Sequence, residues 1–223
     1  MKKPTIAFLF LAISSLVFAQ GNFQVGTMPS IILRKSFPKN WSATFQFESR
    51  QSVFRQELDF DYLLTDIRLA LSKRIAQNIT VGAGYLIRIE EEAVKHRTLQ
   101  QINFGKRFPG FRMTHRLMTE QTFGIEELTE YSLRYRLAVE IPLQGQSIDA
   151  KEFFVRLNNE YVNSLQGGDY DLEIRSVGLL GYSISRRSDF EIGFDNRIDN
   201  FVGGTLRNRL WLRINFFHSL DRL

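Results

Sequence analysis

Charged side chains alternate with apolar ones in the segment YSLRYRLAVEI, residues 131–141. Arg134, Arg136 and Glu140 occupy one set of alternate positions, whereas the other set holds only tyrosine, leucine, valine and isoleucine. A β-strand points successive side chains to opposite faces, so this segment would have one charged and one apolar face. Guanidinium and carboxylate groups on a shared face can form ion pairs, bind ions or line an aqueous channel.

The same alternation recurs along most of the chain, and it suggests which face meets lipid. A charge at mid-depth on a lipid-facing strand costs about 2–4 kcal/mol, so the charged faces should point into the lumen of a barrel. We therefore predict a network of arginines and carboxylates across neighbouring strands, with a structural or pore-lining role. The residues predicted to face the lumen are Glu48, Arg50, Arg97, Arg112, Arg116, Glu120, Arg134, Arg136, Glu140, Arg156, Glu160, Glu173, Arg175, Glu191, Asp195 and Arg197.

Catalytic and metal chemistry have weaker support. The histidines are His96, His115 and His218, and a lipid hydrolase would need one of them beside Ser or Asp. No GxSxG motif occurs, and the absence of cysteine excludes thiolate metal sites and Cys nucleophiles. Acidic residues at 90–92 and 126–127 could hold Ca²⁺, but they are more typical of solvated loop tips. We predict a protein that is not an enzyme, with no catalytic, metal or cofactor site.

Long strands are the elements that would position the charged residues. Each expected strand is about twice the usual five to six residues, which is enough to cross a bilayer core at a tilt. We predict an all-β fold, a transmembrane antiparallel up-and-down β-barrel of about ten strands, with eight to twelve possible. An even number of strands would return both chain ends to the same rim. The expected strands are 41–54, 65–74, 77–89, 95–104, 111–123, 129–141, 151–163, 170–184, 189–199 and 207–219.

Aromatic residues lie at or near the ends of these segments. Trp41, Tyr62, Tyr131 and Trp211 are examples. Transmembrane barrels carry girdles of aromatic side chains at both membrane interfaces, and this placement predicts such girdles.

The N-terminus has the pattern of a secretory signal peptide. Two lysines precede a short apolar run that ends in VFA, which predicts a signal peptide over residues 1–19 with cleavage after Ala19. Residues 20–40 are interpreted as an N-terminal arm, an extra strand or part of a plug, and residues 41–223 as the barrel. Cleavage removes two lysines and no acid, so the net charge falls from +5 to +3. With no basic run, nucleic-acid binding is not expected.

Several strings along the mature chain resemble one known family. WSATFQFESR, HRTLQQINF, THRLMTEQTF, YSLRYRLAVEIPL, FVRLNNEYV and LRNRLWLRINFF are similar, in this order, to the domain-of-unknown-function 2490 family. The resemblance implies an exported outer-membrane β-barrel and no established activity. The chain departs from the family pattern at Lys95, where members often have an acid before the His-Arg pair. It also departs in its last residues, DRL, where many such barrels have a terminal aromatic residue.

Three classes of function follow from these patterns. The favoured one is a small bacterial outer-membrane barrel with a polar lumen lined by Arg and Glu, acting as a narrow pore or as a structural or interaction element. The alternatives are an outer-membrane lipid-modifying enzyme and a soluble periplasmic barrel that binds a ligand. Expected partners are outer-membrane lipid, lipopolysaccharide and the barrel-assembly machinery. The sequence leaves the oligomeric state open.

Overall fold

A computed structural model describes residues 23–55, 57–125, 127–202 and 204–221, and the expected signal peptide over residues 1–19 lies outside these ranges. The described residues form eleven strands and no helix, so none of their segments is a helix able to cross a membrane. The strands are β1 (Phe23–Phe37), β2 (Trp41–Arg55), β3 (Glu57–Ala76), β4 (Ile79–Glu90), β5 (Val94–Phe108), β6 (Phe111–Phe123), β7 (Glu130–Pro142), β8 (Phe153–Gln166), β9 (Asp169–Ser185), β10 (Ser188–Asp199) and β11 (Arg207–Ser219).

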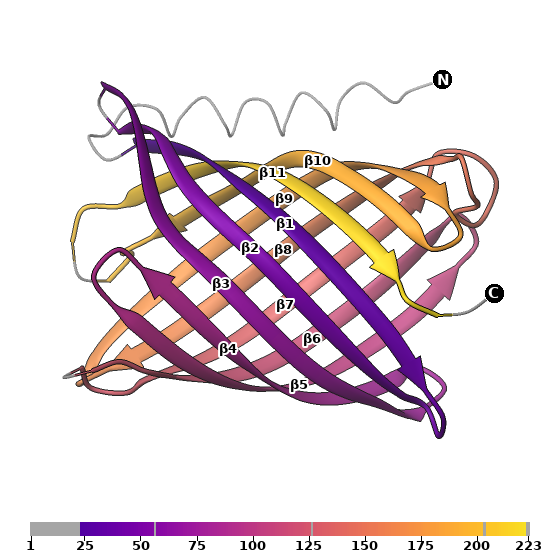
Figure 1. Ribbon diagram of the computed structural model, residues 1–223, viewed down its shortest axis with the longest axis horizontal. Coiled ribbons are helices and arrows are strands. Elements are labelled where there is room, and N and C mark those ends of the chain that lie inside the picture. The colour runs from indigo at the N-terminus through magenta and orange to yellow at the C-terminus, as the bar shows by residue number, and fades with distance from the viewer. Residues whose placement is uncertain (1–22, 56, 126, 203, 222–223) are drawn as a thin grey trace.

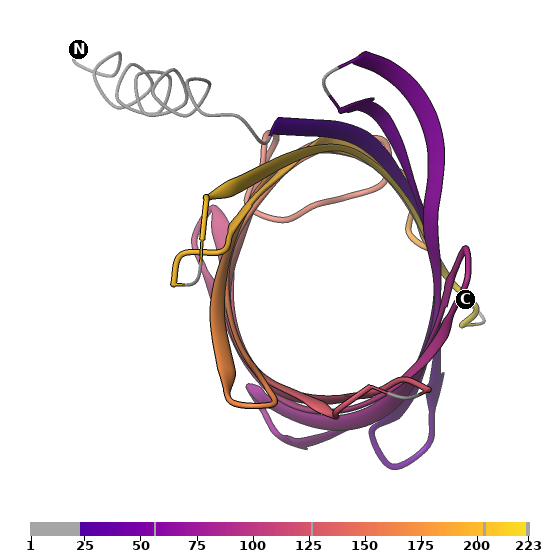
Figure 2. The ribbon, with the colours of Figure 1, turned by 90° about the vertical axis from the view of Figure 1, so that its left-hand side faces the viewer.

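The strands close into one barrel. Each strand pairs antiparallel with its neighbours in sequence, and β1 closes the ring by pairing with β11. The strands run obliquely across the wall in Figure 1, and the end-on view in Figure 2 shows the closed ring. This confirms the predicted all-β barrel. The eleventh strand, β1, comes from the segment whose structure the sequence leaves open, residues 20–40.

The seam between β1 and β11 is parallel, which an even-stranded barrel would not have. Its register runs from Phe23 opposite Asn208 to Arg34 opposite Ser219. The expectation that both chain ends share a rim is therefore wrong. The N-terminal rim carries the start of β1 and the connections that follow β2, β4, β6, β8 and β10. The C-terminal rim carries the end of β11 and the connections 38–40, 77–78, 109–110, 143–152 and 186–187.

Tight turns at both rims are built from residues that tolerate positive φ. Lys39 and Asn40 lie between β1 and β2 with φ of 59° and 64°, and the Asn40 carbonyl accepts a hydrogen bond from the Arg74 amide at 3.0 Å. Gly167 and Gly168 form a two-residue hairpin between β8 and β9, both with positive φ. Two positive φ values are what a type I′ hairpin turn requires.

One hairpin extends beyond the rest of the N-terminal rim. The sequence predicts a loop over residues 55–64, but β2 and β3 continue pairing as far as Arg55 and Glu57. The pairing of β3 with β4 begins only at Leu64, so the tip has a neighbour on one side alone. In Figures 1 and 2 this hairpin projects from the barrel end and curls away from the wall. The tip exposes Leu58 and Phe60 strongly, at 77% and 79%.

The outward face of the wall is mostly apolar. Large exposed side chains occur on every part of it, including Leu69, Leu117, Leu133, Leu180 and Phe194. The buried polar and charged side chains, by contrast, include many of the glutamates and arginines on the opposite face of the same strands. This distribution is the reverse of that in a water-soluble barrel, where apolar side chains fill the interior.

A polar group interrupts the apolar exterior on β5 and β6. Thr98 donates to Gln121 at 2.5 Å, Thr119 donates to Gln100 at 2.8 Å, and the two glutamine amides bond each other at 3.2 Å. These side chains therefore satisfy one another, which reduces the cost of placing them away from water.

Small and large side chains fit together at the seam. Trp211 is predicted from the sequence to lie in an aromatic girdle, but it is only 2% exposed and lies directly opposite Gly26 in the seam register. A Cβ atom on Gly26 would come within 2.4 Å of the Trp211 ring and of the Gln51 carbonyl oxygen. The prediction for Trp211 is therefore wrong, because a glycine on β1 leaves room for the indole inside the barrel. Trp41, Tyr62 and Tyr131 are exposed.

Gly26→Ala is expected to lower the free energy of unfolding by about 1–3 kcal/mol, because the new methyl group overlaps the indole and a backbone oxygen. Urea unfolding in detergent, followed by tryptophan fluorescence, would measure it. The matched control is Gly178→Ala, since a Cβ there meets only Leu157 at 3.8 Å. The control should change the stability by no more than about 0.5 kcal/mol. Equal stability of both variants would contradict the tight seam.

The residues after β11 hold the seam at the C-terminal rim. The Leu220 amide donates to the Arg34 carbonyl at 2.7 Å, and the Asp221 carboxylate accepts from the Ser36 amide and hydroxyl at 2.7 and 2.8 Å. These hydrogen bonds lower the pKa of Asp221 from its usual value, because they favour the ionised form.

Candidate functional site

The lumen contains a polar cavity of about 470 Å³. Its lining includes twelve arginines and seven carboxylates, an excess of five positive charges, together with glutamine, asparagine and threonine side chains. A water molecule needs only about 10–15 Å³ of such volume, so the cavity can hold water and small solutes.

The structure places the sequence-predicted residues together. Every one of the sixteen lines this cavity except Glu173, which lies beside it and bonds Arg175 through two hydrogen bonds of 2.9 Å. The inward orientation follows from strand alternation, since neighbouring residues point to the outer wall. Arg134 and Arg136 face the cavity, for example, while Leu133 between Ser132 and Arg134 is 48% exposed outside.

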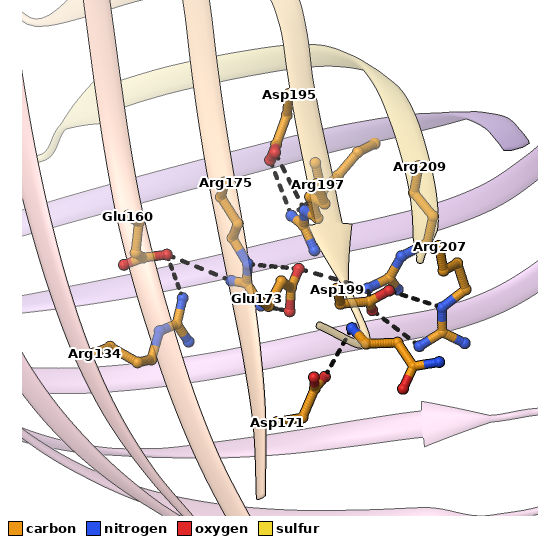
Figure 3. A network of polar contacts seen from close by, with 12 residues as sticks. Arg134, Glu160, Asp171, Glu173, Arg175, Asp195, Arg197, Asp199, Arg207 and Arg209 are labelled. Carbon is orange, nitrogen blue, oxygen red and sulfur yellow. Dashed lines mark hydrogen bonds and ion pairs between the residues drawn. The ribbon is translucent and has the colours of Figure 1, made fainter. Parts of the chain in front are cut away.

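Glu160 is the centre of the densest part of the network. Its carboxylate accepts from Arg116 at 2.6 Å, from Arg134 at 2.7 Å and from Arg175 at 3.4 Å. Arg134 also reaches Glu120 at 2.9 Å. These residues come from four successive strands, β6 to β9, so the contacts tie the strands together on the inner face. Figure 3 shows Glu160 between Arg134 and Arg175.

The chain of ion pairs continues around the wall. Glu173 lies between Arg175 and Arg209, and Asp199 accepts from both Arg209 and Arg207 (Figure 3). Arg209 on β11 thereby reaches past β10 to Glu173 on β9. Contacts of this kind cross-link strands that share no backbone hydrogen bonds.

A second chain of ion pairs crosses the seam. It runs through Arg88, Asp66, Arg50, Glu48, Arg213 and Asp195, with N–O distances of 2.6 to 3.4 Å between successive residues. The ion pair between Arg213 on β11 and Glu48 on β2 spans the intervening strand β1.

The remaining ion pairs extend the network to the other strands. A third group, nearer the C-terminal rim, joins Glu140, Arg156 and Glu191. On β5, Arg97 contacts Glu120 at 3.3 Å and so connects to the group around Glu160. Among the described residues, every strand except β1 therefore contributes to an ion pair.

Sequence reasoning missed several lumen residues. Asp66, Arg68, Arg88, Arg209 and Arg213 take part in the network or line the cavity. The signal was present in each segment. In β3, Asp66 and Arg68 alternate with Ile67 and Leu69, and in β11 Arg209 and Arg213 alternate with leucines and Ile214.

The histidines lie away from the lumen network. His96 bonds the Tyr85 hydroxyl and His115 bonds the Tyr135 hydroxyl, both at 2.8 Å on the outer face. His218 lies 2.9 Å from the Ser188 hydroxyl at the C-terminal rim. No carboxylate among the described residues hydrogen-bonds to these rings, so the described part of the chain assembles no Ser–His–acid triad.

The acidic residues near the N-terminal rim have a cationic neighbour. Lys95 contacts Glu90 at 3.6 Å and Glu127 at 3.0 Å, and so joins two neighbouring connections. Within the described ranges, no three His, Asp or Glu side chains are grouped as metal ligands. Lys95 is also one of the two places where the chain departs from the pattern of the family that it resembles.

Comparison with known proteins identifies a family but no activity. No curated protein and no solved structure shows significant similarity to this chain. The model of a family described as proteins of unknown function, DUF2490, matches residues 26–220, which include almost all of the barrel. The chain therefore belongs to the DUF2490 family.

Proposed function

We propose that this protein is an integral bacterial outer-membrane β-barrel that forms a narrow pore with a positively charged lining. The observation that carries the proposal is the orientation of the side chains. The wall exposes large apolar residues such as Leu69, Leu133 and Phe194, at 53%, 48% and 57%, while the lumen holds the charges. Lipid is the surrounding that suits such a surface.

The same orientation disfavours a soluble ligand-binding barrel. That alternative requires an apolar interior and a polar exterior. Here the lumen lining contains nineteen ionised side chains, and the exterior exposes leucine, phenylalanine and tyrosine along most strands. The exported N-terminal pattern, VFA before Gln20, supports delivery to the envelope.

The cavity supports a pore in preference to a solid structural barrel. Eleven strands give a wider ring than the eight whose side chains just fill the interior. The ion pairs hold many arginines against the wall, and about 470 Å³ remains open between them. Because arginines outnumber carboxylates in the lining, the pore should favour anions.

Planar-bilayer recording tests the pore and its selectivity. The purified barrel is expected to give stable conductance steps, with a reversal potential in a KCl gradient that shows preference for chloride. Arg112→Glu should reduce this preference, because Arg112 lines the cavity and its side chain has no ion pair among the described residues.

Lys106→Glu is the matched control, since it makes the same charge change on the outer face, where Lys106 lies over the Phe108 ring. It should leave the selectivity unchanged. Absence of conductance from folded, heat-modifiable protein would reject the pore and favour the structural element. Recovery of the protein in osmotic-shock fluid without detergent would reject membrane insertion itself.

A further inference from the structure

Three of the arginines lining the cavity lack a carboxylate partner among the described residues, and two of them, Arg68 and Arg136, lie near Arg116. Arg136 makes no ion pair or side-chain hydrogen bond with any described residue. Arg68 has one long hydrogen bond, 3.4 Å to the Gln101 side-chain oxygen, and no ion pair within the described ranges. Both side chains are only partly buried and both line the cavity, so their donors are open to its contents.

Arg116 brings these two groups together. It lies opposite Arg136 in the pairing of β6 and β7, and two such inward side chains on adjacent strands are neighbours. Arg68 reaches Gln101 on β5, and Asn103, two residues further along the same face of β5, lies opposite Arg116 in the pairing of β5 and β6. Glu160 bonds Arg116 and does not bond Arg68 or Arg136.

Three guanidinium groups therefore face one cavity, and among them only Arg116 bonds a carboxylate, that of Glu160. Like charges held close together in a confined interior are unfavourable unless an anion compensates them. An oxyanion fits this need, because guanidinium forks donate paired hydrogen bonds to phosphate and carboxylate oxygens. Gln101, Asn103 and Asn158 line the same cavity and offer neutral amide donors.

We propose that Arg68, Arg116 and Arg136 form a binding site for a small oxyanion inside the lumen. Phosphate, sulfate and simple carboxylates share the required chemistry. The inference deepens the proposed pore by naming its class of solute, and it rests on that function only for access of the anion from water. The cavity, at about 470 Å³, accommodates such an ion with several of its waters.

Isothermal titration of the full-length, detergent-solubilised barrel with inorganic phosphate at low ionic strength tests the site. Saturable binding is expected, with sulfate and acetate as separate arms that identify the preferred anion and chloride as the monovalent reference. Arg136→Gln and Arg68→Gln should each weaken phosphate binding by about tenfold or more, the loss expected for a charge-assisted hydrogen bond. Arg136→Lys should retain part of the affinity, since it keeps the charge but not the fork.

Arg112→Gln is the matched control. It removes a cavity-lining charge four positions from Arg116 on the same strand, and should weaken binding less than about threefold if the site is local. Equal losses of phosphate affinity in all three glutamine variants would reject a local site and indicate diffuse electrostatic attraction to the lumen. The absence of saturable phosphate binding by the folded protein would also reject the site.

Stability measurements guard against misfolded variants. Because Arg136 has no carboxylate partner among the described residues, Arg136→Gln should preserve heat-modifiable migration and should unfold no earlier than the original chain without phosphate. Added phosphate should then delay unfolding of the original chain and not of this variant. Phosphate protecting both equally would count against the site. Phosphate binding without conductance would reject the pore and support the oxyanion site. Conductance without phosphate binding would reject the oxyanion site and support the pore.

Discussion

Glu160→Gln is expected to lower the free energy of unfolding by about 3–5 kcal/mol, a larger loss than any other single substitution in the lumen should cause. Glu160 is 5% exposed, and its carboxylate bonds Arg116, Arg134 and Arg175. The neutral amide leaves Arg116 without a carboxylate and removes one of the carboxylate partners of Arg134 and of Arg175. Its NH₂ group is a donor and would point at the N–H donors of the arginines. Urea unfolding in detergent or lipid vesicles, followed by heat-modifiable migration, would measure the loss.

Glu140→Gln is the matched control for Glu160→Gln. Glu140 is more exposed and bonds Arg156, which keeps its second partner, Glu191, when Glu140 is neutralised. The control should therefore cost about 1 kcal/mol or less. A loss as large as that of Glu160→Gln would contradict the central role of Glu160.

A second substitution can separate lost attraction from misfolding. Adding Arg116→Gln to Glu160→Gln removes the guanidinium that has lost its only carboxylate partner, since Arg134 keeps Glu120 and Arg175 keeps Glu173. The double variant should be more stable than the single one, with a coupling energy of about 0.5–3 kcal/mol. Additive losses would show that Glu160 acts through packing instead of charge.

Strand alternation explains why the lumen residues could be predicted from sequence. Within a strand, the position of a charged residue relative to its apolar neighbours fixes the face on which it lies. The rule directs Arg134 and Glu160 inward, and both line the cavity. The alternation rule does not require knowing which residues form ion pairs, so it applies to every strand of the barrel wall.

The sequence could not predict which arginine bonds which carboxylate in the lumen, because these contacts depend on how strands far apart in the sequence are paired. Arg136 lies opposite Glu160 in the register of β7 and β8, yet Glu160 bonds Arg116, Arg134 and Arg175 instead. Side-chain length and shear decide such choices. The spacing of arginines and glutamates along one strand therefore does not reveal which guanidinium is left unpaired.

The number of strands and the parallel seam could not be predicted either, because they also depend on pairing between segments far apart in the sequence. The segment QVGTMPSIILRKSF has alternation that is interrupted by Pro29, and one of the two strands with which it pairs, β11, lies at the far end of the chain. The fit of Trp211 against Gly26 arises from the same long-range pairing. The tip of the β2–β3 hairpin is different. Leu58 and Phe60 already alternate with acidic residues there, and the acidic composition obscured a strand that the pattern indicated.

Leu117→Arg tests the surroundings of the barrel, as Glu160→Gln tests its interior. Leu117 lies at the middle of β6, faces outward and is 44% exposed. If lipid surrounds the wall, the substitution should destabilise the barrel in vesicles by about 2–4 kcal/mol, because the guanidinium enters hydrocarbon far from either interface. Reversible unfolding by urea in vesicles of phosphatidylcholine would measure the change.

The control for Leu117→Arg is Leu165→Arg, one position from the end of β8 and 48% exposed. Its guanidinium lies near an interface and should cost at most about 1 kcal/mol. Water around the wall would make both substitutions nearly neutral, since a surface arginine replaces an exposed leucine in each. The depth dependence, and not the loss at one position, therefore distinguishes lipid from water. Equal small effects would reject membrane insertion while leaving the ion-pair network and the oxyanion site intact, because neither depends on what contacts the outer face.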